Sequence, residues 1–213
     1  MLAGVPSVFV RLSGCNLRCK WCDTPYASWE PEGEERMLGS ILADVRRNWA
    51  SHVVVTGGEP MISPGIVVLT EKLKGLDQHI TIETAGTVYA PVTCDLMSIS
   101  PKLANSTPHR RDGGRWAAQH DRLRYQPEVL RRLMSEYAYQ LKFVVSAESD
   151  LEEIEKIIEE TGADRSRVML MAEGTNVETI YERAQWLVEV CKRERFRYSP
   201  RLHIDLWGDK RGV

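Results

Sequence analysis

The sequence predicts an α/β protein in which parallel strands alternate with crossover helices, as in a complete or partial β/α barrel. Short apolar runs rich in β-branched residues alternate with longer stretches whose apolar residues recur at helical spacing. This alternation favours a parallel sheet, because parallel neighbours need a long crossover connection. The most unusual segments follow directly after predicted strands, at the edge where such folds place their ligand-binding loops.

Apolar runs along the chain predict buried strands, since both faces of a parallel sheet are usually covered. The predicted strands are Val5–Leu12, His52–Thr56, Ile80–Thr84, Asp95–Ser100, Gln140–Ser146, Arg167–Met171 and Leu202–Leu206.

Amphipathic stretches between several of these runs predict helices with one apolar stripe. They are Ser40–Asn48, Ile66–Lys74, Pro127–Tyr137, Leu151–Thr161 and Val177–Arg195. Ser149 and Glu152 have the spacing of a capping box, and Gly162 stands where a left-handed C-terminal cap is expected. We expect one domain over residues 1–213.

The bulk composition is that of an ordinary soluble globular protein. The chain is 43% hydrophobic and 27% charged, with a formal net charge of −2, which argues against nucleic-acid binding by bulk charge. No apolar run reaches the roughly 18 residues of a membrane span, and the first residues lack the features of a signal peptide. We therefore expect a cytoplasmic protein with reduced thiols, and neither a membrane nor a nucleic-acid partner.

The segment GCNLRCKWCDTPYA brings Cys15, Cys19 and Cys22 within eight residues, whereas Cys94 and Cys191 stand alone in predicted core segments. A structural zinc site would need a fourth ligand, and a redox pair would not need a third thiol. A four-iron cluster held by three cysteines keeps one iron open for another ligand. The spacing favours the cluster and leaves zinc as the weaker alternative.

The segment PSVFVRLSGCNLRCKWCDTPYA, together with VVVTGGEP, IETAGT, SISPK and RLHIDLWGDKRGV, resembles the radical S-adenosylmethionine superfamily. Within it, the motifs are most similar to the 7-carboxy-7-deazaguanine synthase family, over nearly the whole chain. The resemblance implies a partial β/α barrel of the radical SAM type. It also implies a 4Fe-4S cluster on Cys15, Cys19 and Cys22, S-adenosyl-L-methionine and Mg²⁺ as cofactors.

The activity implied by this resemblance is that of a carbon–nitrogen lyase. It would convert 6-carboxy-5,6,7,8-tetrahydropterin to 7-carboxy-7-deazaguanine with loss of ammonia, for queuosine and other 7-deazapurines. An electron donor such as flavodoxin and a homodimeric state are implied as well. No residue is assigned as an acid or base.

The resemblance also assigns residues to S-adenosylmethionine. They are Trp21, Cys22, Asp23, Gly57, Gly58, Glu59, Thr84, Ser100, Pro101, Lys102, Met171, Ala172, Glu173 and Gly174. Taken alone, the glycine pair would indicate only a tight turn, Lys102 a solvated charge and Met171–Gly174 the end of a strand.

For the metal and the substrate, the family implies that the Thr24 hydroxyl binds Mg²⁺, although the residue types alone favour a helix cap. Arg11, Thr56, His203 and the terminal carboxylate of Val213 would contact the pterin. The alternatives are an exposed Arg11, a β-branched strand residue at Thr56, and a core histidine at His203.

One departure from the family concerns the start of the sequence. Family members usually carry a QGEG-like stretch before the first strand, and its glutamine and glutamate bind the pterin. Here Met1-Leu2-Ala3-Gly4 stands in its place, so either the true start lies upstream or the pterin site is incomplete.

Two rival functions remain open at this point. A radical-activating enzyme would use the same cysteines on a glycyl partner, but Thr24, Arg11 and the RLHIDLWG ending argue against it. An iron–sulfur electron carrier or zinc module would leave GGEP and SPK without a role.

Residues 103–125 depart from the strand–helix alternation and form a basic insert. It contains arginines and histidines that outnumber Asp112 and Asp121, namely His109, Arg110, Arg111, Arg115, His120, Arg122 and Arg124. Because Gly113-Gly114 interrupts any helix, we expect a solvated loop that could cover the site or dock an acidic electron donor.

Overall fold

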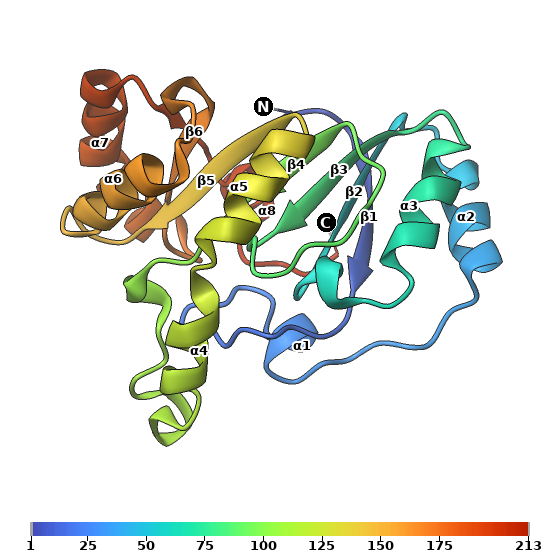
Figure 1. The fold of residues 1–213 in the computed structure, drawn as a ribbon, viewed down its shortest axis with the longest axis horizontal. Coiled ribbons are helices and arrows are strands. Elements are labelled where there is room, and N and C mark those ends of the chain that lie inside the picture. The colour runs from blue at the N-terminus through green and yellow to red at the C-terminus, as the bar shows by residue number, and fades with distance from the viewer. Residues whose placement is uncertain (1, 213) are drawn as a thin grey trace.

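The computed structural model describes residues 2–212, and one parallel sheet forms its centre (Figure 1). Seven strands follow one another in chain order, each parallel to the next. They are β1 (Ser7–Leu12), β2 (His52–Gly57), β3 (His79–Thr84), β4 (Leu96–Ile99), β5 (Tyr139–Val145), β6 (Val168–Ala172) and β7 (Arg197–Tyr198). Because β1 and β7 lie at opposite ends of this order, the sheet stays open, and the predicted α/β partial barrel is confirmed.

Helices pack around the sheet, some beside the end formed by β1 and others beside the end formed by β6 (Figure 1). Their bounds are α1 (Pro25–Ser28), α2 (Leu38–Arg47), α3 (Ile66–Lys74), α4 (Ala117–Arg124), α5 (Pro127–Glu136), α6 (Asp150–Thr161), α7 (Val177–Glu194) and α8 (Leu202–Trp207). Short 3-10 turns are η1 (Pro60–Ile62), η2 (Ala104–Ser106), η3 (Arg111–Gly114) and η4 (Arg165–Arg167).

The core lies between the sheet and its covering helices. Alternate strand residues point into it and are completely buried, for example Val55, Ile82 and Phe143. Leu73 of α3 and Leu187 of α7 are also fully buried in this core. The strand and helix periodicities of the sequence therefore meet in one apolar layer.

The ends of α6 show one cap that was predicted and one that was not. Gly162 has φ 68° and ψ 29°, so the left-handed C-terminal cap is confirmed. The predicted capping box between Ser149 and Glu152 is wrong, because Ser149 has helical backbone angles and makes no capping hydrogen bond. Instead, Asp150 Oδ2 accepts hydrogen bonds from the amides of Ser146 at 2.8 Å and Ala147 at 3.1 Å, in the turn that precedes the helix.

The predicted strand Leu202–Leu206 is also wrong, since these residues form helix α8. Ile204 is buried, whereas Leu202 and Leu206, one helical turn apart on the other face, are exposed, so only one of these three apolar side chains faces the core. The edge of the sheet after β6 is occupied by β7, which pairs through Met169–Arg197 and Leu170–Tyr198.

The basic insert is not a loop throughout. Gly113 and Gly114 have φ of 63° and 75° and interrupt the helix, as expected, but α4 begins shortly after them, at Ala117. Figure 1 shows α4 and α1 below the sheet, next to the connection that leaves β1. In residues 2–212 no helix has the length and apolar character that crossing a membrane requires.

Candidate active site

The loop with the three cysteines follows β1 and lies at the edge where strands β1 to β6 end, which we call the carboxyl edge. Its backbone is held from several sides: the Gly14 amide donates to the Ala27 carbonyl at 2.9 Å, and the Lys20 amide donates to the Ser106 carbonyl at 2.7 Å. Asn16 adds a side-chain hydrogen bond to Thr87, in the loop after β3. The loop is therefore fixed by three other segments.

The thiols on this loop are shielded from water. Burial raises the pKa of Cys15 to about 11 and that of Cys19 to about 12. All three cysteines are free and lie in one small apolar cluster with Leu17 and Ala85. Such thiols become good metal ligands when a cation displaces their protons.

The glycine pair of GGEP lets two backbone segments approach closely. A Cβ on Gly57 would lie 2.0 Å from the Leu12 carbonyl oxygen, and one on Gly58 would lie 2.1 Å from that of Gly14. The Gly58 amide donates to the Leu12 carbonyl at 3.1 Å. The glycines therefore seat the turn after β2 against the start of the cysteine loop.

Glu59 braces this turn from inside. It is 1% exposed, and its carboxylate accepts hydrogen bonds from the Met61 amide, the Thr84 hydroxyl and the Ala85 amide at 2.7 to 3.1 Å. Burial raises its pKa, and the three donors oppose that shift. The carboxylate of Glu59 thus joins the ends of β2 and β3 and is turned inward.

The next segment along the carboxyl edge is Ser100–Lys102. The Ser100 amide donates to the Thr84 carbonyl at 2.7 Å. The Lys102 ammonium donates to the carbonyl and hydroxyl oxygens of Ser100 at 2.7 and 3.0 Å. Its charge lowers the pKa of Cys15 and Cys19, although burial has the larger effect on both. A positive group therefore lies near the buried thiols.

Beyond Cys22, the chain makes an ion pair that links the two ends of the sequence. Arg201, which is 7% exposed, pairs through Nη2 with Asp23 Oδ2 at 2.5 Å. Burial alone would raise the pKa of Asp23, but the charge and hydrogen bond of Arg201 outweigh it and lower that pKa. Arg201 Nη1 also lies 3.8 Å from the Met171 sulfur. The pair thus connects the cysteine loop to β6.

Thr24 is the residue before α1, where a helix cap would stand. Its side chain makes no capping hydrogen bond. The hydroxyl lies 3.8 Å from the Cys22 sulfur, and Cys22 is 3.1 Å from the Ser28 hydroxyl. The threonine oxygen therefore lies beside the cysteine loop, and the helix-cap alternative is not supported by a hydrogen bond.

The inner face of the sheet carries polar residues toward the same edge. The Thr56 hydroxyl donates to Glu83 Oε2 at 2.9 Å, and Lys142 Nζ lies 3.8 Å from Glu83 Oε1. Arg11 is the register partner of Thr56 on the neighbouring strand and is exposed. A carboxylate, a hydroxyl and two cationic side chains from four strands thus share this face.

The segment at the end of β6 is packed against α7. The Glu173 amide donates to the Val145 carbonyl at 2.9 Å, and Arg183 of α7 pairs with the Glu173 carboxylate at 2.6 Å. Ala172 is fully buried and Met171 is half-buried. Gly174 has φ 151°, and a Cβ there would meet the Ile180 side chain at 3.0 Å.

The C-terminal segment returns to the cysteine loop. Arg211 pairs with Glu32 at 2.9 Å and stacks over the Tyr26 ring at 3.8 Å. His203 lies on α8 with much of its side chain exposed, and the partial burial of its ring, together with the charge of Arg201, lowers its pKa. It is therefore a helix residue near the Asp23–Arg201 pair. Val213, predicted to contact substrate through its carboxylate, lies outside the described residues.

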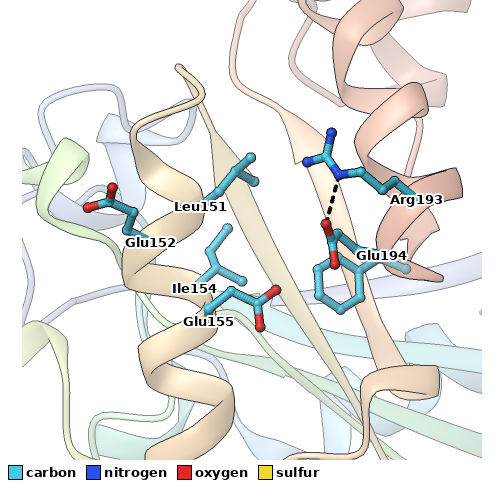
Figure 2. Close-up of a pocket in the computed structure, with 7 residues that line it drawn as sticks. Leu151, Glu152, Ile154, Glu155, Arg193 and Glu194 are labelled. Carbon is cyan, nitrogen blue, oxygen red and sulfur yellow. Dashed lines mark hydrogen bonds and ion pairs between the residues drawn. The ribbon is translucent and has the colours of Figure 1, made fainter.

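A separate hollow of about 180 Å³ lies between α6 and the end of α7 (Figure 2). Leu151 and Ile154 line it together with a pair formed by Arg193 and Glu194. None of the predicted cofactor or substrate residues lines it. It is a gap in the outer helical layer and is separate from the carboxyl edge.

Comparison with known proteins identifies the kind of enzyme. The profile of the Radical SAM superfamily matches residues 9–124. The 7-carboxy-7-deazaguanine synthase of Rhodopirellula baltica is 42% identical over all of this chain and 83% of its own length. That of Halobacterium salinarum is 44% identical, over 98% of this chain and 85% of its own. The chain belongs to the radical SAM superfamily and, within it, to the 7-carboxy-7-deazaguanine synthase family.

Solved structures agree with this membership. The crystal structure of QueE from Escherichia coli is 25% identical and superposes with a TM-score of 0.69, over 93% of this chain and 86% of that one. Streptococcus suis SuiB bound to S-adenosylmethionine is 13% identical and has a TM-score of 0.61, over 95% of this chain and 52% of that one, so it shares the fold.

Membership in the radical SAM superfamily implies a 4Fe-4S cluster and S-adenosylmethionine, and the thiols fit such a cluster. In residues 2–212 no group of three or more His, Cys, Asp or Glu side chains could hold a metal ion as the side chains stand. In a four-iron cluster each cysteine sulfur binds a different iron atom, so the three sulfurs need not converge on one point. A largely apolar setting, in which Cys19 is buried and Cys15 and Cys22 are half-buried, also limits contact of the sulfurs with water.

Several residues that build this site were not identified from the sequence. Glu83 and Lys142 are charged residues within otherwise apolar strands, and that contrast was a signal that could have singled them out. Arg201 gave no such signal, because its partner Asp23 is distant along the chain.

Proposed function

We propose that this chain converts 6-carboxy-5,6,7,8-tetrahydropterin to 7-carboxy-7-deazaguanine with loss of ammonia, in a Mg²⁺-dependent reaction that serves queuosine and other 7-deazapurines. The names of its relatives support this substrate class. The observation that most supports this function is the contact between the cysteine loop and the GGEP turn. This turn directly follows Thr56, whose hydroxyl donates a hydrogen bond to Glu83 on the polar inner face of the sheet. Radical generation and substrate recognition would thus take place on either side of one turn.

The residues proposed for the cofactors lie along the carboxyl edge. Cys15, Cys19 and Cys22 would hold the cluster, which together with S-adenosylmethionine supplies an adenosyl radical when bound. Lys102 would place its ammonium beside the carboxylate of that cofactor, since it already lies near the thiols. The backbone of Gly57 and Gly58 would face its methionyl part.

The adenosyl part of the cofactor would meet two further segments, Trp21–Asp23 and Met171–Gly174. Their mutual contact through Arg201, which pairs with Asp23 and approaches Met171, supports this assignment. Glu59 and Thr84 would act through the turn that they brace, because Glu59 accepts from the Thr84 hydroxyl.

The substrate would lie against the inner face of the sheet. A guanidinium matches a carboxylate in shape and charge, so the exposed Arg11 would bind the carboxyl group of the pterin. Thr56, His203 and Val213 would complete its contacts. The Thr24 hydroxyl would be one oxygen ligand of Mg²⁺, a cation that usually keeps several waters and few protein ligands.

We further propose a cytoplasmic location, in which the thiols stay reduced, an acidic one-electron donor such as flavodoxin, and a homodimer. The exposed Phe9 on edge strand β1 supports a dimer, because it leaves apolar surface beside an unpaired strand edge.

The test is anaerobic reconstitution with iron and sulfide, followed by assay with the carboxypterin, S-adenosylmethionine, Mg²⁺ and dithionite. We expect a four-iron cluster whose spectrum changes on addition of S-adenosylmethionine, and formation of the deazaguanine. Cys19→Ala should abolish both. Cys94→Ser, which changes a thiol far along the chain from the loop, should leave both intact.

A loaded enzyme that makes no deazaguanine would contradict the proposed function. It would then favour a radical-activating enzyme if it cleaves S-adenosylmethionine, or an electron carrier if it does not. A zinc-containing protein without iron would overturn the cofactor assignment as well.

A further inference from the structure

A surface of positive charge and indole rings covers the outside of the cysteine loop. We call it the basic indole face, and it consists of Arg18, Lys20, Trp29, Arg110, Arg111 and Trp116. A hollow of about 410 Å³ opens between the two indoles. It is formed where the cysteine loop and α1 meet the basic insert, segments that are remote from each other in the sequence.

The two indoles hold guanidinium groups in fixed places. The Arg111 Cζ lies 3.9 Å from the Trp29 ring centroid, and the Arg18 Cζ lies 5.1 Å from that of Trp116. Arg115 also stacks on Trp116, at 4.7 Å, but pairs with Asp112 at 3.1 Å. Stacking on a ring restrains a charged side chain at the surface without neutralising it.

The basic indole face is attached directly to the backbone of the cysteine loop. Trp29 Nε1 donates to the Cys19 carbonyl at 2.9 Å, and Arg18 Nη1 donates to the Cys15 carbonyl at 2.7 Å. Arg111 Nη1 donates to the Lys20 carbonyl at 3.2 Å. Cys19 itself is only 8% exposed. A protein approaching the cluster from outside would therefore meet the indoles and arginines before it met sulfur.

The charge of this face has the opposite sign to that of the whole chain. The formal net charge of the chain is −2, yet the face carries the positive charges of Arg18, Lys20, Arg110 and Arg111. Two acidic residues line the hollow: Asp112, which is paired with Arg115, and Glu30. A local basic patch on an acidic protein attracts acidic partners and orients them during encounter.

We propose that the basic indole face is the docking surface for an acidic single-electron carrier protein, and that Trp29 is its central anchor. This inference rests on the proposed function, because a radical SAM reaction needs one electron from outside. The carrier loses that electron and the bound cluster gains it, and no bond of this chain forms or breaks. Tryptophan and arginine at the centre of a patch are the residue types that anchor protein interfaces.

The experiment compares two electron donors on the reconstituted enzyme. The docking variant is Lys20→Glu/Arg110→Glu, because both side chains are exposed, the Lys20 carbonyl accepts from Arg111, and Arg110 precedes Arg111 in the chain. The matched control is Lys72→Glu/Lys156→Glu, which makes the same change in net charge on α3 and α6. Reduction of the cluster by reduced flavodoxin is followed by absorbance, without pterin, at low and high salt. Dithionite-driven cluster reduction and turnover are measured in parallel.

We expect the docking variant to lower the second-order rate of cluster reduction by flavodoxin about tenfold or more at low salt, with a weaker salt dependence. Dithionite-driven reduction and turnover should be unchanged, and the control should match the unmodified enzyme with both donors. Trp29→Phe keeps a ring but loses the hydrogen bond to Cys19, and it should also slow reduction by flavodoxin.

Equal slowing in the docking and control variants would overturn the proposal, since the effect would then come from net charge alone. Equal slowing with both donors would also overturn it, because these residues would then support the cluster itself. An unchanged rate of cluster reduction by flavodoxin would overturn it too. If a binding titration with a short RNA then showed weaker binding by the docking variant, the face would be assigned to a nucleic acid instead. Because cluster reduction is measured without pterin, failure to make the deazaguanine would leave this test intact.

Discussion

The two faces of the sheet are built from the same strands and differ in almost every property. The outer face buries Val55, Ile82 and Phe143 completely against the helices. On the inner face, residues that alternate with these are polar or charged, for example Thr56, Glu83 and Lys142. One face therefore supplies the free energy of folding, and the other keeps polar groups in place at a cost that the first must offset.

This difference predicts which substitutions change stability and which change activity. Neighbours in sequence on one strand point to opposite faces, so they form matched pairs for the comparison. Lys142 and Phe143 on β5 are such a pair.

The largest effect on stability is expected on the outer face. Phe143→Ala removes a fully buried ring from the core and should lower the free energy of unfolding by about 3–5 kcal/mol. Urea unfolding under anaerobic conditions measures this. Phe143→Leu, which retains most of the apolar volume, should lower the free energy of unfolding much less. If Phe143→Ala lowered it by an equally small amount, the outer face would not be the main source of stability.

A smaller, pH-dependent effect on stability is expected at His120, which contacts the cysteine loop. His120 is 1% exposed, and burial lowers its pKa from 6.5 to about 4. Its Nδ1 accepts from the Arg18 amide at 3.1 Å, and its Nε2 lies 2.8 Å from the Ser106 hydroxyl. The histidine is thus neutral in the folded chain while the unfolded chain protonates it.

Stability should therefore fall as the pH drops from 6.5 toward 4, because the unfolded state binds the extra proton in that window. The loss from this group is about 3 kcal/mol, at about 1.4 kcal/mol per pKa unit. Urea unfolding at several pH values measures it. In His120→Asn, which keeps an acceptor without titrating there, the pH dependence should become shallower. An unchanged slope would contradict this role of His120.

The smallest effect on stability is expected on the inner face. Lys142→Met removes a partly exposed ion pair with Glu83 and should change the free energy of unfolding by no more than about 1 kcal/mol. Turnover of the carboxypterin should nevertheless fall about tenfold to a hundredfold, because Glu83, which holds the Thr56 hydroxyl proposed to contact the pterin, loses its neighbouring positive charge. Anaerobic kinetics with matched cluster content measure this. A loss of stability as large as that of Phe143→Ala would remove the distinction between the faces.

Most of the regular structure could be predicted because it depends on local periodicity. The helix Ile66–Lys74 agrees with its prediction, and strands β1 to β6 agree within about two residues. The alternating apolar residues of Leu202–Leu206 fit a strand, but the segment forms a short helix after β7 in which Ile204 is the buried residue. Helix α4 was missed because its residues are mostly polar.

The site residues that belong to short motifs could be predicted, whereas those that reach the site from other segments could not. The cysteines and the glycine pair are recognisable from residue type and spacing alone. The support for the loop is not, because Arg201, His120 and Trp29 reach it from segments whose proximity depends on the fold.

By itself, the sequence determined the alternation of strands and helices and the thiol spacing that favours an iron–sulfur cluster, because both depend on residues close together in the chain. The tertiary structure alone decided how Glu59 is buried, how Asp23 is paired, and which charges gather over the cysteine loop. Those features depend on the solvent exposure and field at each atom, and these are set by parts of the chain that pack together only after folding.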